Sequence, residues 1–210
     1  LSTSYFGPVS WYRHIARTTQ PVYIDAQERF VKQTNRSRCK IATANGVQTL
    51  SVPLTYNNGD IITDVRISDH NNWRHLHWQA LSSAYGSSPF FEYYADDIRP
   101  FFNPNWEFLY DFNKDITLKM CELIGITPDI REKGELPSEE EKVHSSHISH
   151  PDVKGDSSSL REYYQVFRHR HGFIPDLSIL DLLFNMGPEA IIWLKNPLPA
   201  SPYRGGDGRM

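Results

Sequence analysis

The sequence has few cysteines and no long hydrophobic run, and both absences exclude classes of protein. Only two cysteines, Cys39 and Cys121, occur in 210 residues, so a disulfide framework is not indicated and a reducing compartment is the simpler assumption. Apolar runs such as residues 191–194 are far shorter than the roughly 20 residues that cross a bilayer. We therefore expect a cytoplasmic protein with no membrane span.

Net charge is also small, and glycine and proline are not in excess. The 22 Lys and Arg residues against 25 Asp and Glu give a formal charge of -3, which argues against nucleic acid as the main partner. The 12 glycines and 14 prolines are close to average usage, so no fibrous or low-complexity class is indicated. What remains is a hydrophobic content of 39% with 13% aromatics, enough to bury the core of one globular domain.

The first hundred residues alternate between extended and helical patterns. Residues 1–4 read as the end of a strand, residues 11–16 carry apolar side chains at helical spacing, and residues 22–24 form a short apolar run. The dipeptide Asn45-Gly46 predicts a hairpin over residues 40–52. We expect an α/β fold, with a mixed or parallel sheet flanked by helices.

Helical patterns dominate the rest of the chain and give its division. Apolar residues recur at helical spacing from Trp73, Phe90, Trp106, Leu177 and Pro188 onward, so the C-terminal part is expected to be mainly helical. We divide the chain into an α/β core with a ligand site (1–126), an acidic, serine-rich surface loop (127–159), a helical segment that packs on the core (160–195) and a flexible tail (196–210).

The strongest local signal is a basic segment, residues 29–40, whose five basic side chains stand against the single acidic residue Glu28 next to it. Arginine grips carboxylate or phosphate groups with two hydrogen bonds, and a neighbouring Asn or Gln can read hydroxyl or carbonyl groups. Such a segment suits an anionic ligand. The alternative is a solvated basic loop that binds nothing.

Asp25 and Gln27 follow the predicted strand 22–24 directly. Open α/β sheets bind ligands beyond the carboxyl ends of their strands, so this position favours a functional role. The structural alternative is that Asp25 only turns the chain after the strand.

Three weaker signals remain. The stretch Phe6-Gly7-Pro8 resembles the opening of nucleotidylyl transferases, although the His pair of those enzymes is missing. His144, His147 and His150 recur every third residue, but in a polar segment without a supporting ligand, so we predict no metal site. His77, one helical turn after Trp73, is either a buried boundary histidine or a donor to a bound anion.

Taken in order, these motifs resemble the WbqC-like protein family over residues 4–126 and 160–195. The similarity rests on Phe6-Gly7-Pro8 with Tyr12, residues 22–25 with Gln27, Lys32, Asn35, Arg36, Arg38 and Ile41, residues 45–46 and 50–53, Trp73, His77, Tyr85, Pro89 and Phe90, and residues 172–183. The resemblance implies a protein of O-antigen or other surface-polysaccharide biosynthesis, and a transferase that decorates a sugar. The opening Ser4-Tyr5-Phe6-Gly7-Pro8 departs from the Gln-Pro-x-x-x-Pro of many members, which leaves the substrate open.

The residues and the resemblance together define a candidate site for a small-molecule or nucleotide-sugar ligand. We predict Asp25 as the catalytic base and, as substrate-binding residues, Tyr12, Gln27, Lys32, Asn35, Arg36, Arg38, Trp73 and His77. No particular cofactor is indicated. The alternatives are a non-catalytic protein that binds a nucleotide-sugar or glycan, or acts as a scaffold, and an enzyme similar to nucleotidylyl transferases.

Overall fold

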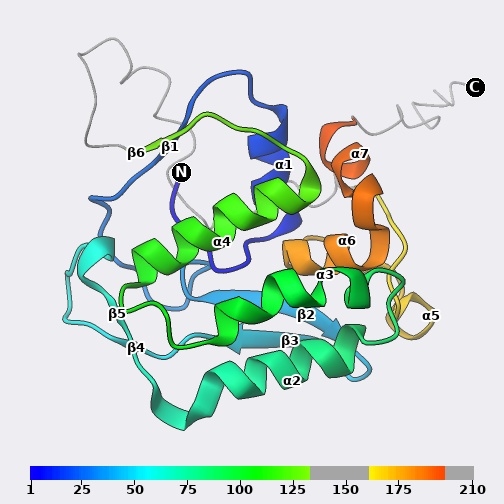
Figure 1. The fold of residues 1–210 in the computed structure, drawn as a ribbon, viewed down its shortest axis with the longest axis horizontal. Coiled ribbons are helices and arrows are strands. Elements are labelled where there is room, and N and C mark those ends of the chain that lie inside the picture. The colour runs from blue at the N-terminus through cyan, green and yellow to red at the C-terminus, as the bar shows by residue number, and fades with distance from the viewer. Residues whose placement is uncertain (133–160, 197–210) are drawn as a thin grey trace, which may run out of the picture.

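The computed structural model describes residues 1–132 and 161–196 (Figure 1). Its α-helices there are α1 (Val9–Arg17), α2 (Trp73–Tyr85), α3 (Phe91–Ile98), α4 (Leu109–Ile124), α5 (Arg168–His171), α6 (Ile179–Met186) and α7 (Ala190–Lys195). The strands are β1 (Val22–Ile24), β2 (Arg38–Thr43), β3 (Gly46–Ser51), β4 (Leu54–Thr55), β5 (Arg66–Ile67) and β6 (Ile130–Glu132). Short 3-10 helices are η1 (Ile62–Asp64), η2 (His70–Asn72), η3 (Arg99–Phe102) and η7 (Gly187–Glu189).

The strands of the described part form three small sheets of two strands each. β1 pairs in parallel with β6, whereas β2 with β3 and β4 with β5 are antiparallel. The hairpin turns at Ala44 and Asn45, and Gly46 takes the left-handed φ of 106° that the tight turn requires. The expected α/β class and the helical C-terminal part are therefore confirmed, with parallel and antiparallel pairs both present.

Two short segments differ from the sequence-based expectation. Residues 1–4 form no strand: the carbonyl of Leu1 accepts from the N–H of Asp25 at the end of β1, and residues 2–4 then enter the interior, where Asn113 donates to the hydroxyl of Thr3. Residues 130–132, which open the expected surface loop, form β6 because they pair with β1 along its whole length. Residues 133–159 of that loop and residues 197–210 of the predicted tail lie outside the described residues.

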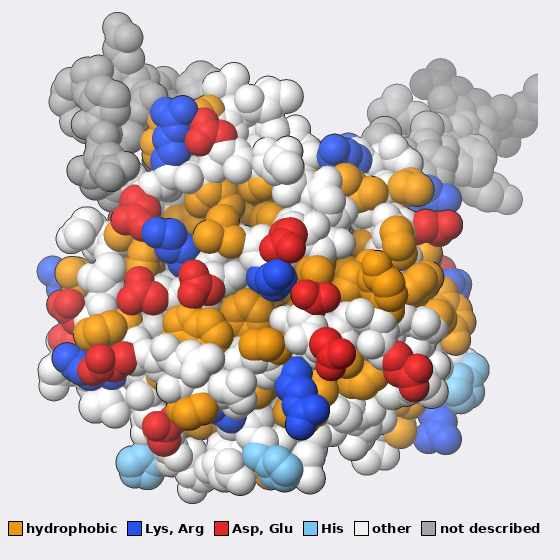
Figure 2. Space-filling view, viewed as in Figure 1, with side chains coloured by type: hydrophobic (Ala, Val, Ile, Leu, Met, Phe, Trp, Pro, Cys, Tyr) orange, Lys and Arg blue, Asp and Glu red, His pale blue; other side chains and the backbone are white. Residues whose placement is uncertain are grey.

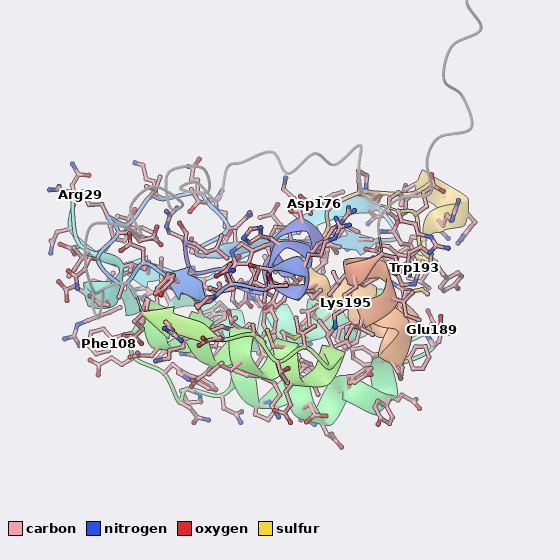
Figure 3. All side chains as sticks on the ribbon, turned by 90° about the horizontal axis from the view of Figure 1, so that it is seen from above. Arg29, Phe108, Asp176, Glu189, Trp193 and Lys195 are labelled. Atoms are coloured by element: carbon pink, nitrogen blue, oxygen red, sulfur yellow. The ribbon has the colours of Figure 1, made fainter. Side chains whose placement is uncertain are left out.

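Residues 176 and 177, just before α6, bind the first turn of α1. The carboxylate of Asp176 accepts hydrogen bonds from the backbone N–H of Ser10 at 2.8 Å and from its hydroxyl at 3.0 Å, and so caps the first turn of α1 (Figure 3). The N–H of Val9 donates to the carbonyl of Leu177 at 2.9 Å. The C-terminal segment therefore fixes the N-terminal helix.

A second set of hydrogen bonds between distant segments lies in the core, at Asp181 on α6. Its carboxylate accepts hydrogen bonds from the hydroxyls of Tyr85 and Tyr163, each at 2.8 Å, and from the Gln165 amide at 3.0 Å. Burial raises its pKa to about 6, although these hydrogen bonds oppose the rise. Asp181 thus links α6 to α2 and to the segment before α5.

The face shown in Figure 2 intersperses acidic and basic side chains with apolar ones, so it has no extended patch of one charge sign. Within the described ranges, no helix combines the length and the apolar character that a membrane crossing requires.

Candidate functional site

Arg36, the centre of the basic segment, is a buried side chain and not an exposed clamp. Its guanidinium binds Glu28 through two hydrogen bonds, from Nε at 3.0 Å and from a terminal nitrogen at 2.5 Å, and also donates to the hydroxyls of Thr34 and Ser2. Only 3% of the Arg36 side chain and 12% of the Glu28 side chain are exposed. The charge of Arg36 is therefore neutralised within the protein, and its geometric role is to hold residues 28–36 against residue 2.

The other predicted residues of the segment are dispersed around Arg36. Lys32 is exposed, and Arg38 is half-buried on β2. Asn35 contributes its backbone carbonyl, which accepts from the N–H of Tyr5 at 2.9 Å. The structure thus leaves Lys32 and Arg38 at the surface and joins Asn35 to the N-terminal segment.

Asp25 lies where the sequence predicted, immediately after β1. One carboxylate oxygen accepts the N–H of Gln27 at 3.0 Å, so Asp25 also turns the chain, and Gln27 itself is exposed. Since β1 and β6 are parallel and Ile24 is in register with Glu132, Asp25 and Glu132 share the carboxyl edge of the pair.

Several carboxylates lie near Tyr110 on α4, at this edge of the strand pair. Burial raises the pKa of its phenol, and the carboxylates of Glu132, Asp111, Asp25 and Glu28 raise it further. Lys114 balances this charge in part, because its ammonium group lies 2.5 Å from Glu132. The edge therefore gathers carboxylates, of which Glu132 pairs with Lys114 and Glu28 pairs with Arg36.

Tyr12 and His77 are buried among aromatic rings. Tyr12 on α1 is fully buried against Trp11, and burial raises the pKa of its phenol well above the ordinary value. His77 on α2 is 5% exposed, and its Nδ1 lies 2.9 Å from the hydroxyl of Tyr5. Burial lowers the pKa of His77 to about 4, so the imidazole is neutral where it shares this hydrogen bond with the Tyr5 hydroxyl.

Trp73, one turn before His77, lines a surface cleft of about 460 Å³. The cleft lies between the start of α2, which contributes Trp73, Arg74 and Trp78, and η3, which contributes Arg99 and Phe102. The structure therefore places Trp73 and His77 on one helix, the first at the cleft and the second directed to Tyr5 in the core.

Sequence reasoning missed the cationic residues of this cleft. Arg74 and Trp78 lie four positions apart on a helix that was predicted, so their shared face was a usable signal. Arg99 could not be found in the same way, because only the fold brings η3 beside α2.

The loop that resembled nucleotidylyl transferases is closed. The carbonyl of Phe6 accepts from the Ser178 hydroxyl at 2.7 Å, and the carbonyl of Gly7 accepts from the N–H of Ile179 at 2.8 Å. Asp176 caps the first turn of α1, where a phosphate would bind. These contacts argue against nucleotidylyl transfer at this loop.

Metal-binding groups do not cluster in the described ranges, where no set of three His, Cys, Asp or Glu residues is close enough to share an ion. His144, His147 and His150 lie outside the described residues. Cys39 and Cys121 are both buried and unpaired, and burial raises the pKa of both thiols, so neither is an activated nucleophile.

Comparisons with known proteins point to one family. The model of the WbqC-like protein family matches residues 3–151. The chain is similar to an uncharacterized protein of Mycobacterium tuberculosis, Rv1507c. The alignment is 208 residues long with 26% identity, and it covers 83% of this chain and 86% of the relative. No solved structure matches at a significant level.

Proposed function

Because this chain belongs to the WbqC-like protein family, we propose that it is a transferase of O-antigen or other surface-polysaccharide assembly that acts on an anionic substrate. The substrate is of the nucleotide-sugar or aminoacyl type, and the accepting group is a hydroxyl or an amine. Both need a base that removes a proton as the new bond forms.

The observation that carries the proposal is the position of Asp25. It follows β1 at the carboxyl edge of a parallel strand pair, the location at which α/β proteins bind ligands. Asp25 is half-buried, and its turn with Gln27 fixes the carboxylate. We assign Asp25 as the general base and Lys114, beside Glu132, as the cation that limits repulsion between this acidic edge and the substrate.

The predicted binding residues take two roles in this proposal. Lys32, Arg38 and Gln27 are at least partly exposed and can contact the substrate directly. Arg36 acts as a positioning residue, since its bonds to Glu28 and Ser2 fix the segment that carries the others. Its truncation therefore disturbs the site without removing a substrate contact.

The test is product formation after the protein is incubated with candidate nucleotide-sugar or aminoacyl donors and with hydroxyl or amine acceptors, followed by mass spectrometry. We expect Asp25→Asn to abolish turnover and to spare donor binding. Asp96→Asn, an exposed carboxylate on α3, is the matched control and retains activity. Turnover by Asp25→Asn at the wild-type rate would rule out the assigned role.

A second candidate is a protein that binds a nucleotide-sugar or glycan without turning it over. The observation that favours it is the neutralised state of Arg36, because the strongest predicted anion clamp is used inside the fold. This candidate predicts donor binding by the wild type with donor and acceptor recovered unchanged.

A further inference from the structure

The cleft at the start of α2, defined by Trp73, Arg74, Trp78 and Arg99, combines two arginines, of which Arg99 is exposed, with two tryptophans. Two guanidinium groups lie over indole rings, Arg74 at 4.6 Å from the ring centroid of Trp73 and Arg99 at 5.9 Å from that of Trp78. Both arginines and both tryptophans line the same cleft. Cations and flat apolar faces are thus combined in one concave surface.

The aromatic floor of the cleft is held in place from below. Trp78 stacks on Phe91 with ring centroids 5.9 Å apart, and it also packs against Phe102 at 5.7 Å. The indole N–H of Trp73 donates to the carbonyl of Ser68 at 2.9 Å. A ligand therefore meets rings that are already ordered, which lowers the entropic cost of binding.

The charges of the cleft favour an anion. Asp69 is the acidic residue of its lining, and it forms an ion pair with Arg74. Arg99 is exposed and pairs with no carboxylate of the described residues. The charges of Asp69 and Arg74 cancel, so the positive charge of Arg99 remains on the lining of the cleft.

A second cleft, of about 580 Å³, provides a contrast on the other side of the same helix. It lies between the hairpin turn and α2, and its polar lining consists of uncharged side chains such as Asn45, Gln48 and Gln79. It contains no cation among its lining residues, so the electrostatic preference for an anion is specific to the first cleft.

The geometry points to the α2–η3 cleft as a binding site for a phosphorylated ligand that carries a flat ring, such as a nucleoside diphosphate. The phosphate groups bind Arg99 and, in competition with Asp69, Arg74, while the ring packs against the part of the Trp78 indole that Phe91 leaves uncovered, beside Arg99. The inference goes beyond the proposed function, because Asp25, Lys32 and Arg38 do not line this cleft. It is tested by binding alone, so failure of turnover does not decide it.

The experiment is isothermal titration calorimetry of the purified chain with UDP, GDP and ADP, compared with uridine and with inorganic pyrophosphate. We expect at least one nucleotide to bind at least tenfold more tightly than either the nucleoside or pyrophosphate, because only the nucleotide uses both ring and cation. Affinity should fall as salt rises. Equal affinity for pyrophosphate and every nucleotide would overturn the role of the ring, and no binding of any nucleotide would overturn the site.

Variants separate this cleft from other cation–indole and cation–phenyl pairs. Arg99→Gln and Trp78→Leu should each weaken nucleotide binding by tenfold or more. Arg66→Gln is the matched control, because Arg66 also lies over an aromatic ring, Phe108 at 4.7 Å, but outside the cleft. Unchanged binding by both cleft variants, or an equal loss in Arg66→Gln, would contradict the proposal. Thermal unfolding of each variant verifies that it is folded.

Discussion

The hydroxyl of Tyr5 lies 2.9 Å from Nδ1 of His77, which is 72 residues later in the sequence. Burial holds the phenol protonated, since the pKa of Tyr5 is raised well above its ordinary value. The same burial lowers the pKa of His77 to about 4. Tyr5 and His77 therefore share a hydrogen bond as two neutral groups, and the pair joins the N-terminal segment to α2 without any net charge.

The low pKa of His77 makes stability depend on pH. The unfolded chain binds a proton at the ordinary value of 6.5, whereas the folded protein does so only at about 4. The contribution is therefore complete above pH 6.5 and is lost as pH falls toward 4, by an amount of the order of 3 kcal/mol. We expect the destabilisation caused by His77→Gln to be about 2 to 3 kcal/mol smaller at pH 4.5 than at pH 7, measured by urea unfolding.

Asp181 provides the control for this experiment, because its contribution to stability changes with pH in the opposite direction to that of His77. Its folded pKa is raised from 3.8 to about 6, so its contribution to stability is present below pH 4 and is lost as pH rises to 6. Asp181→Asn should therefore be relatively less harmful at pH 7 than at pH 4.5. The same pH dependence in both variants would contradict the two assignments.

Removing only one charge of the buried pair of Arg36 and Glu28 should lower the stability of the protein strongly. Glu28→Gln leaves the guanidinium without a countercharge in the interior, so we expect a loss of about 3 to 5 kcal/mol in the free energy of unfolding. Chemical denaturation measures this loss. The exposed pair of Arg66 and Glu107 is the control, and Glu107→Gln should cost less than about 1 kcal/mol.

The pair also predicts non-additivity. A double variant that replaces both Arg36 and Glu28 by apolar residues of similar size should be more stable than Glu28→Gln alone, because no buried charge is left unpaired. The same two apolar replacements are also measured singly, at Arg36 alone and at Glu28 alone. If the losses of these two single variants simply add in the double variant, the ion pair is not the source of the effect.

Gly187, at the junction of α6 and η7, is expected to tolerate no side chain. A Cβ at this position would lie 2.5 Å from the ring of Phe90, and the backbone φ of 55° is left-handed. We expect Gly187→Ala to lower stability by about 2 to 4 kcal/mol through the clash and the strained φ together, as measured by thermal unfolding. Gly46→Ala, with a φ of 106° and open space around it, isolates the backbone contribution and should cost only about 1 kcal/mol.

Local signals explain which parts of the fold were predictable. The hairpin of β2 and β3 follows from Asn45-Gly46, and α2 follows from the spacing of its apolar residues. The sequence does not predict β6, because three residues in a polar segment carry no pattern and only their pairing with β1 makes them a strand.

The local placement of single residues of the candidate site was more predictable than the partners that surround them. Asp25 follows its strand as expected, since strand and turn are both local. The sequence shows Arg36 beside other basic residues but cannot show that Glu28 neutralises it, because burial is a property of the whole fold. Arg99 lies beside α2 only because of the path that the chain takes through α3 and η3, which the sequence does not show.

The contact between Ser10 and Asp176 has a consequence for synthesis on the ribosome. The carboxylate that caps α1 is encoded 166 residues after the residue it binds, which at translation speeds of about 5 to 20 residues per second amounts to roughly 10 to 30 s of waiting. During that interval the first turn of α1 lacks its partner and Val9 lacks the carbonyl of Leu177. The nascent chain must therefore remain incompletely folded until its C-terminal helices have emerged, and folding of this domain is completed only after nearly all of it has been made.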